Sequence, residues 1–480
     1  MTASTHSTVV HPQSIGKTVP FVIRTHKAPS REEQHLQTLR SLVWLYFCLL
    51  IFEGALRKWV APALSAPLLV VRDPLVLLIY IQALRYRRFP MDGLLFPYFA
   101  LFGCFVVLAV FQITLSIGGG VLVSLYGLRT NFLHIPLIFV LPRVLSRDDV
   151  IKIGKWTLIL AVPMTFLMVL QFFSPPNSWL NAATIVESQQ IQSALGRIRP
   201  AGTFSFATGV AHFYVLATTF AVYGLLERKA PYPKWLLWAA VISIAAVQPV
   251  SGSRLLVLGC GLVLVAALIS GLLNPGRVER LLVMAIVIAA AVEILLLTSF
   301  FREAVVVFTT RWNDASAAAG GVKQGLVWRF LGGFLDPFLL VPEIGLLGKG
   351  IGMGTNAASA LMTGSFQFLL AEGEWSRVVL EAGPILGFSF LLYRVWLAGV
   401  MAFRSLRAVN HQQLLPWLLA WSACRSIITE QLSQPTNLGF MILFSGLCLA
   451  SMTKDRSQSL SASERLRYSK SPVQQPLPSS

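Results

Sequence analysis

Charged residues are scarce in this chain of 480 residues: Asp, Glu, Lys and Arg make up 12% of it, whereas hydrophobic residues make up 55%. A soluble domain could not cover its surface with so few charges, so the composition indicates a polytopic membrane protein. The net charge is +18, but the basic residues lie mainly in short hydrophilic gaps between apolar runs. That placement follows the positive-inside rule and argues against a nucleic-acid partner.

Cysteine is scarce as well. The chain has five cysteines, all inside apolar runs and none in a Cys-x-x-Cys pair: Cys48, Cys104, Cys260, Cys424 and Cys448. Cysteines in such surroundings usually act as small buried hydrophobic residues, so we expect no disulfide and no metal site. We expect no cofactor either. A signal peptide is also lacking before the first apolar run, because residues 1–38 are polar. The first transmembrane helix is therefore expected to act as an uncleaved signal.

Long apolar runs are what the chain has in abundance, and each of twelve approaches the length of about 20 residues that crosses a bilayer. We therefore predict an all-α polytopic fold of about 12 transmembrane helices within a membrane domain at 39–453. Polar tails at 1–38 and 454–480 are expected to be disordered. The predicted spans are 40–56, 66–84, 93–113, 119–141, 152–173, 206–226, 234–251, 255–273, 281–300, 383–403, 413–429 and 437–453.

The loops between these spans alternate in charge. Basic residues are concentrated on one side, at 85–88, 143–155, 228–234, 277–280 and 404–407. The positive-inside rule puts these loops and both basic tails in the cytoplasm. The long gaps at 174–205 and 301–382 then face outward, the second between spans nine and ten. A gap as long as 301–382 that contains many aromatic residues and glycines is typical of a functional loop.

Several ionisable residues lie in the outward half of their spans or at its edge: Glu53, Arg72, Asp73, Glu293, Arg425 and Glu430. Such residues are costly in a bilayer and usually face a partner or a water-filled cavity. Pairs such as Glu53 with Arg72, or Arg425 with Glu430, would lock helices together. A one-sided set of charges equally fits a cavity for an anion such as a lipid phosphate, which arginine binds well through its planar pair of donors.

Three motifs combine charged residues with small residues at the predicted outer surface: GRIRPAGTFS at 196–205, SGSR at 251–254 and EGEWSRVVLEAGPILG at 372–387. Glycine lets the backbone approach a ligand closely. In the third motif Glu374, Arg377 and Glu381 share one helix face, because they are three and four residues apart. Glu372 falls off that face.

Two further segments of the gap at 301–382 are expected to be structural. The run GLLGKGIGMGT is not a phosphate-binding loop of nucleotide hydrolases, because no glycine precedes Gly348 by the required four-residue spacing and Lys349 is not directly followed by Ser or Thr. We expect tight turns there. The segment 322–341 has the pattern of an amphipathic helix that lies along the membrane surface.

The layout and these motifs together resemble the O-antigen ligase and O-antigen (exopolysaccharide) polymerase superfamily of integral-membrane glycosyltransferases. The matches are an arginine followed by a small residue, glycine and Thr-Phe at 199–204, the Ser253-Arg254 turn, a glycine-rich stretch at 348–355, and Glu-x-Gly-x-x-x-Gly starting at Glu381. The stretch 52–73 resembles a subgroup of proposed exopolysaccharide polymerases. The resemblance implies a GT-C-like fold in the bacterial inner membrane, with an active face outside the cytoplasm.

The resemblance also implies a reaction. A polyprenyl-diphosphate-linked glycan would be the donor, a glycan or a lipid A-type molecule the acceptor, and the transfer would be inverting and metal-independent. Arg199 and Arg254 match the family arginines that hold the diphosphate, whose developing charge they would stabilise. Arg377 and Arg72 are further candidates for substrate binding. Membrane lipids and a chain-length regulator are the other partners that the resemblance implies.

The chain departs from the ligase pattern at one place. Ligases of the superfamily carry a histidine about ten residues before the Glu-x-Gly, whereas 301–382 contains no histidine and has Glu372 at that position. A positioned carboxylate can also deprotonate a hydroxyl. We therefore predict Glu372 or Glu374 as the general base, with His212 as an alternative, and favour a polymerase over a ligase.

Two other functions remain open at this point. A transporter or flippase of lipid-linked oligosaccharide would use charges near the middle of the membrane, where Arg129 and Arg394 are predicted to lie. A non-catalytic scaffold of a polysaccharide export complex is the second alternative.

Overall fold

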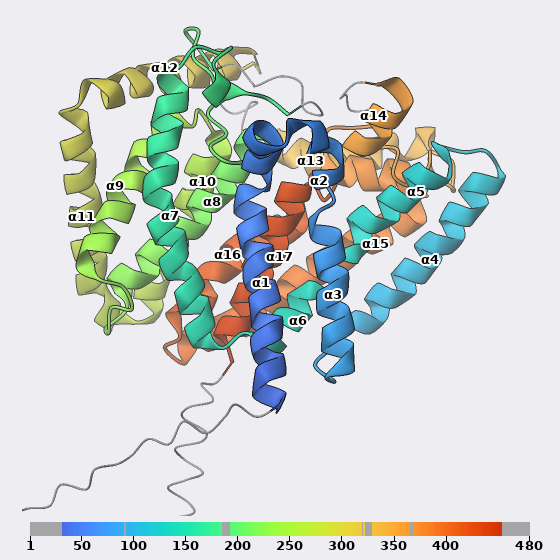
Figure 1. The fold of residues 1–480 in the computed structure, drawn as a ribbon, viewed down its shortest axis with the longest axis horizontal. Coiled ribbons are helices and arrows are strands. Elements are labelled where there is room, and N and C mark those ends of the chain that lie inside the picture. The colour runs from blue at the N-terminus through green and yellow to red at the C-terminus, as the bar shows by residue number, and fades with distance from the viewer. Residues whose placement is uncertain are drawn as a thin grey trace, which may run out of the picture.

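The computed structural model describes residues 31–90, 93–184, 193–318, 320–321, 329–364 and 369–453. This part of the chain is built from helices and contains no β-strand (Figure 1). The predicted all-α fold is therefore confirmed. Helices suit the apolar runs because a helix satisfies its backbone hydrogen bonds internally, as a segment in lipid must.

Most of the helices form the bundle itself: α1 (Arg31–Ala55), α3 (Arg72–Arg85), α4 (Leu95–Thr114), α5 (Gly120–Leu128), α6 (Leu137–Val144), α7 (Arg147–Phe173), α8 (Ala207–Leu226), α9 (Lys234–Val250), α10 (Arg254–Leu273), α11 (Val278–Leu296), α15 (Glu374–Asn410), α16 (Leu414–Thr429) and α17 (Pro435–Ser451). Four others lie toward the upper end in Figure 1: α2 (Ser65–Leu68), α12 (Ser299–Ala318), α13 (Arg329–Leu340) and α14 (Asn356–Thr363). The upper end is therefore capped by helices and not only by loops.

Within the described residues, seven helices are long and apolar enough to cross a membrane, and nine spans result if each of two bent pairs counts as one. The bent pairs are Pro62–Leu68 with Arg72–Arg85, and Pro275–Leu296 with Ser299–Ala318. Among the shorter apolar helices are α9, α16 and α17. These features indicate a polytopic α-helical membrane protein.

The first helix starts earlier than the sequence predicts. Residues 31–38 were expected in a disordered tail, but α1 begins at Arg31. Two features of this segment favour a helix. Glu32 and Glu33 lie in its first turn, where acidic side chains offset the helix dipole. The ring of His35 also stacks on Tyr86 of the turn after α3, at 3.8 Å between centroids. The remainder of the predicted tails, 1–30 and 454–480, lies outside the described residues.

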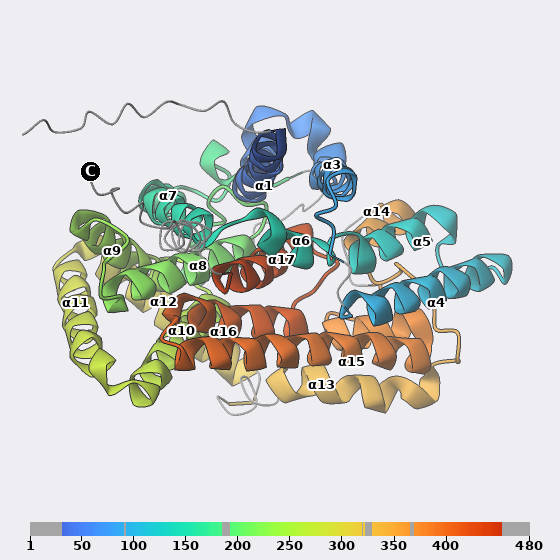
Figure 2. The ribbon, with the colours of Figure 1, turned by 90° about the horizontal axis from the view of Figure 1, so that it is seen from below.

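The centre of the bundle is formed by α8 and α17. Nearly every residue of both helices is buried, including the polar Thr219 and Ser445. Seen from below, α8 and α17 lie between α7 and α6 on one side and α10 and α16 on the other (Figure 2). A helix surrounded by other helices needs no polar face, which explains why both segments are apolar all round.

Three helices are broken near the upper end. α1 and α5 each continue into a π-helical turn, Leu56–Val60 and Arg129–Leu133. α15 bends at Gly383, whose φ of 75° is left-handed, just before Pro384. Such breaks free backbone groups and turn side chains toward the interior. Arg129 begins the second π-helical turn and is partly buried, and Arg377 is buried six residues before the bend of α15.

The interval 301–382, predicted as a single outer loop, is largely helical in its described residues. α11 ends at Leu296 and the chain turns by 100° into α12, so the predicted span at 281–300 ends a few residues early. The predicted surface helix at 322–341 is represented by α13, and its residues 322–328 lie outside the described residues. The glycine-rich run forms turns, as predicted. A Cβ at Gly352 would lie 2.1 Å from the carbonyl oxygen of Val123, so the run packs closely against α5.

Candidate active site

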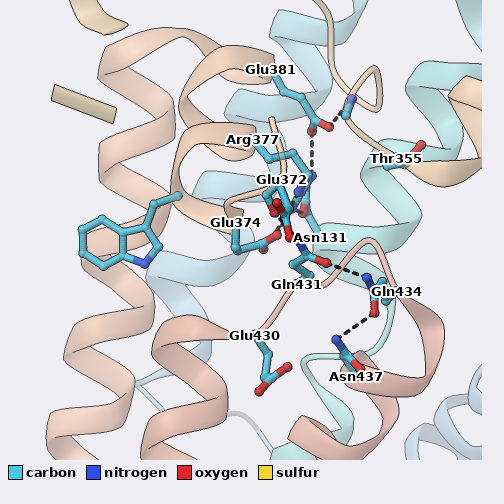
Figure 3. A network of polar contacts seen from close by, with 12 residues as sticks. Asn131, Thr355, Glu372, Glu374, Arg377, Glu381, Glu430, Gln431, Gln434 and Asn437 are labelled. Carbon is cyan, nitrogen blue, oxygen red and sulfur yellow. Dashed lines mark hydrogen bonds and ion pairs between the residues drawn. The ribbon is translucent and has the colours of Figure 1, made fainter. Parts of the chain in front are cut away.

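The polar side chains of the interior gather where α15 and α17 begin and α16 ends (Figure 3). Asn131, from the π-helical turn after α5, faces the carboxylates of α15. A chain of amides runs alongside: Asn437 donates to Gln434, which donates to Gln431. Gln431 donates in turn to the carbonyl oxygen of Glu372. Segments far apart in sequence thus form one polar layer.

Arg377 is at the centre of this layer, and its side chain is 2% exposed. Its Nε and Nη2 donate to the two carboxylate oxygens of Glu374, at 2.8 and 2.9 Å. Its Nη1 donates to Glu381 at 2.9 Å, and Nη2 also donates to Asn131 at 2.9 Å. The predicted sharing of one helix face by Glu374, Arg377 and Glu381 is therefore confirmed.

A second arginine holds Glu374 from the opposite side. Arg394 Nη1 donates to Glu374 Oε1 at 2.6 Å. The same guanidinium donates to the carbonyl oxygens of Ile427 and Glu430, at 2.6 and 2.9 Å. Arg394 thus ties the start of α15 to the end of α16, and both oxygens of Glu374 are occupied by charge-assisted hydrogen bonds.

Next to this network is a cluster of Glu430, Arg425 and His212. Glu430 Oε1 accepts from Arg425 Nη1 at 2.5 Å, and Glu430 Oε2 lies 3.2 Å from His212 Nε2. The pair of Arg425 with Glu430 was predicted from the sequence and is confirmed. His212, the alternative base, is a buried residue of α8 that contacts both charged partners.

The charges of α1 and α3 are paired too. Arg72 Nε donates to Glu53 at 3.0 Å, which confirms another predicted pair, and Arg72 Nη2 donates to the carbonyl oxygen of Pro435 at 2.6 Å. Asp73 accepts from Arg129 Nη2 at 2.8 Å and lies 2.9 Å from His134 Nε2. The neighbours Arg72 and Asp73 thus have separate partners, as their different helix faces require.

Arg199 and Arg254 differ from all these arginines. Neither forms an ion pair with a carboxylate in the described part of the chain. Arg254 begins α10, donates to the carbonyl oxygen of Trp312 at 3.0 Å, and stacks over that indole at 4.9 Å. The Nε–H of Arg199 is buried and donates no hydrogen bond within the described residues. By contrast, Arg197 of the same loop is paired with Glu303 at 2.5 Å.

Gly252 lies next to Arg199 and Arg311, and two residues before Arg254. Its φ is +55°, a left-handed value that favours glycine. A Cβ there would lie 3.5 Å from Cγ of Arg199 and 3.5 Å from Cδ of Arg311, a residue of α12. Burial first, and the charge of Arg311 second, lower the pKa of Arg199 to about 10. Arg254 is close enough to Arg311 for its charge to act on that guanidinium as well. Arg199, Arg254 and Arg311, here called the arginine cluster, therefore concentrate positive charge on this side of the upper end.

A cavity of about 670 Å³ opens beside Glu372 and Glu374. α13 forms one wall with Phe334 and Asp336, and the start of α15 forms another with Trp375. Thr429 and Gln431 line it from the end of α16. Glu372 is exposed to this space, whereas Glu374 is 4% exposed. The cavity is of the size that binds small organic ligands, with polar groups on an apolar frame.

The Glu-x-Gly-x-x-x-Gly motif has a structural role in this site. Glu381 Oε1 accepts the backbone N–H of Gly354 at 2.9 Å, which joins the glycine-rich turns to α15. A Cβ at Gly383 would lie 2.1 Å from the carbonyl oxygen of Leu346. The motif therefore lets α15 bend while the turns pack against it, and this fixes where the cavity wall begins.

The predicted site residues thus fall into three sets. Glu372 and Glu374 line one cavity, and Arg199 and Arg254 belong to the arginine cluster. Arg72 and Arg377 lie in buried ion pairs. The sequence did not identify Arg311 as a site residue. Its segment, RWND at 311–314, contains two charged residues, but only the fold shows that Arg311 lies beside Gly252.

No protein-family model, curated protein or solved structure matches the chain. The described residues contain no group of three or more His, Cys, Asp and Glu side chains arranged to hold a metal ion. The fold and site therefore define the chain as an α-helical membrane protein with a polar site at one end.

Proposed function

We propose that this chain is a membrane glycosyltransferase that polymerises polyprenyl-diphosphate-linked oligosaccharides during bacterial surface polysaccharide synthesis. The observation that supports this best is the arginine cluster. Three guanidinium groups that repel one another, two of them without a carboxylate partner in the described residues, form a favourable site for a polyanion. A diphosphate has the required charge and the oxygen geometry that guanidinium groups bind.

The proposed topology puts the site outside the cytoplasm of the bacterial inner membrane. α1 begins and α17 ends at the same end of the bundle, opposite the site (Figure 1). Arg40 of α1 supports this placement, since it donates to the carbonyl oxygen of Val144 where α6 ends. The seven long spans, the two bent pairs and α9, α16 and α17 would make up the twelve predicted crossings.

In the proposed reaction an acceptor sugar hydroxyl attacks the anomeric carbon of the donor from the face opposite the diphosphate. The new C–O bond forms as the bond to the diphosphate breaks, and the electron pair of that bond moves onto the diphosphate oxygen. Arg199, Arg254 and Arg311 would stabilise that charge electrostatically, which is usually a large contribution to catalysis. The hydroxyl proton would pass to a base.

Glu372 is the base that we propose. It is exposed and lines the cavity, so an acceptor hydroxyl can reach it. Glu374 is less suitable because Arg377 and Arg394 occupy both of its oxygens. The ion pairs of Glu374 would instead hold the start of α15 in place beside Glu372.

A flippase is supported less well. That alternative relied on Arg129 and Arg394, and these side chains bind Asp73 and Glu374. A transport pathway would need such charges to face a continuous aqueous route.

The test is reconstitution of the purified protein in vesicles with a lipid-diphosphate oligosaccharide. We expect a ladder of products that differ by whole repeat units. Transfer of a single chain to a lipid A acceptor would instead mean a ligase, and movement of the donor across the bilayer without bond formation would mean a flippase. Absence of both transfer and movement with native donor would favour the scaffold alternative.

A further inference from the structure

A second cavity, of about 840 Å³, lies at the opposite end of the protein from the candidate active site. It is lined where α6, α15 and α17 end, and its basic residues are Arg143, Arg404, Arg407 and His411. Since a helix rises by about 1.5 Å per residue, the part of α15 between its bend at Gly383 and Arg407 alone spans about 36 Å. The two cavities therefore cannot share one ligand of ordinary size.

The lining of this cavity combines cations with an apolar floor. Phe139, Pro142, Leu449 and Met452 form much of the apolar part. The described residues that line it include no Asp or Glu. Arg143, Arg404 and Arg407 are all exposed. A ligand that fits has an anionic head and an apolar body.

Helix dipoles explain only part of this charge. Cations near the end of a helix offset its dipole, but the effect fades within the last turn. Arg404 lies more than one turn before Asn410, where α15 ends. The positive-inside rule favours a cation at this end of the bundle, and an anion in the cavity would stabilise Arg404 beside Arg407.

The surroundings favour a lipid over a soluble anion. Phe403 and Leu406 of α15, directly beside the two arginines in sequence, are 55% and 40% exposed. Large apolar side chains exposed on a membrane helix are suited to acyl chains, and arginines beside them reach the headgroup level. The ring of Phe403 also lies 4.2 Å from the guanidinium carbon of Arg407, so the two kinds of surface are continuous.

The chain's own tail is a poor occupant. The segment 454–480 directly follows Thr453, which lines the cavity. That segment has five Lys and Arg against two Asp and Glu, so its charge has the same sign as the cavity. A neighbouring basic segment adds to the attraction for an anion.

We propose that this cavity binds the phosphate headgroup of an anionic phospholipid, with Arg404 and Arg407 as phosphate ligands and the apolar floor against the start of the acyl chains. Basic pockets between helix ends bind anionic headgroups in this way. This lipid site takes no part in the proposed sugar transfer, and it is inferred only from the charge and the shape of the cavity.

The test compares lipid binding by the full-length protein and two variants. Native mass spectrometry in detergent would measure retention of phosphatidylglycerol against phosphatidylcholine. Arg404→Gln with Arg407→Gln should weaken phosphatidylglycerol binding by about 25-fold, because each cation near an anionic surface contributes a factor of about five. The control, Arg228→Gln with Lys229→Gln, removes two exposed cations that do not line the cavity.

We expect the control to bind phosphatidylglycerol as the wild-type protein does, and inorganic phosphate at millimolar concentration not to displace the lipid. Equal loss of binding in both variants would overturn the proposal, since it would show attraction to the whole basic surface. Full displacement by inorganic phosphate would also overturn it, because the ligand would then be a soluble anion. A thermal melt of each variant without lipid, expected to match the wild type, separates lost binding from misfolding.

Discussion

Arg377 and Glu374 are joined by two parallel hydrogen bonds, from Nε to Oε2 at 2.8 Å and from Nη2 to Oε1 at 2.9 Å. Both side chains are almost fully buried, and Arg394 and Glu381 extend the pair into a network of alternating charge. In such a network each charge is tolerated in the interior only because of its neighbours. The pair therefore holds the wall of the cavity that contains Glu372, the proposed base.

Removal of one charge from this pair should destabilise the protein. Glu374→Gln leaves Arg377 and Arg394 with less compensation, and we expect a loss of about 3–5 kcal/mol in the free energy of unfolding. Thermal melts in detergent would measure it. The control is Glu303→Gln, which breaks the more exposed pair with Arg197 and should cost less than about 1 kcal/mol. Wild-type stability with lost turnover in Glu374→Gln would instead mark Glu374 as the base.

If the arginine cluster binds the diphosphate, substitution of its arginines should remove the polymer and leave the amount of protein in the membrane unchanged. Arg199→Ala and Arg254→Ala should each abolish long glycan, because the diphosphate would lose charge stabilisation when it leaves. Gel analysis of the glycan together with immunoblots of the membrane fraction would measure both quantities. Arg197→Ala is the matched control in the same loop, since Arg197 binds Glu303 and not the cluster. Normal chain length in both cluster variants would rule out the diphosphate role.

Glu372→Gln should lower turnover by at least about a hundredfold if Glu372 is the general base, because the amide does not accept the proton. The protein should remain as stable as the wild type, since this side chain is exposed. Single-turnover rates of repeat addition in vesicles would test this. Turnover near the wild-type value would direct attention to Glu374 or His212.

Because α15 bends at one of its glycines, we expect glycine-to-alanine substitutions at two positions of this helix to change protein stability in opposite directions. Gly383→Ala should destabilise the protein by about 1–3 kcal/mol through backbone strain, since φ is +75° there, and its Cβ would also meet the carbonyl oxygen of Leu346. Gly399→Ala is the control: a Cβ there has no neighbour within 4 Å, and alanine favours a helix by about 1 kcal/mol. Melting temperatures that fall in both variants would show that the bend is not the cause.

The sequence by itself determined the class of fold and part of the pairing. Long apolar runs can be only helices in a bilayer, so the all-α fold could be predicted from composition and run length. The pair Arg72 with Glu53 and the pair Arg425 with Glu430 followed from the cost of unpaired charge in the membrane. The shared face of Glu374, Arg377 and Glu381 followed from helical periodicity.

Only the tertiary structure decided that Arg394 binds Glu374, whereas Arg199 binds no carboxylate within the described residues. Arg199, Arg254 and Arg311 come from three separate segments, and their proximity depends on the turn at Gly252 and on the path of α12. The sequence predicted a helix at 322–341 but not α12 or α14, because α12 carries many polar residues and α14 has only eight residues. The pattern of apolar and polar residues in a segment indicates whether that segment is buried or exposed. Which side chains from distant segments come into contact depends on how all the helices pack.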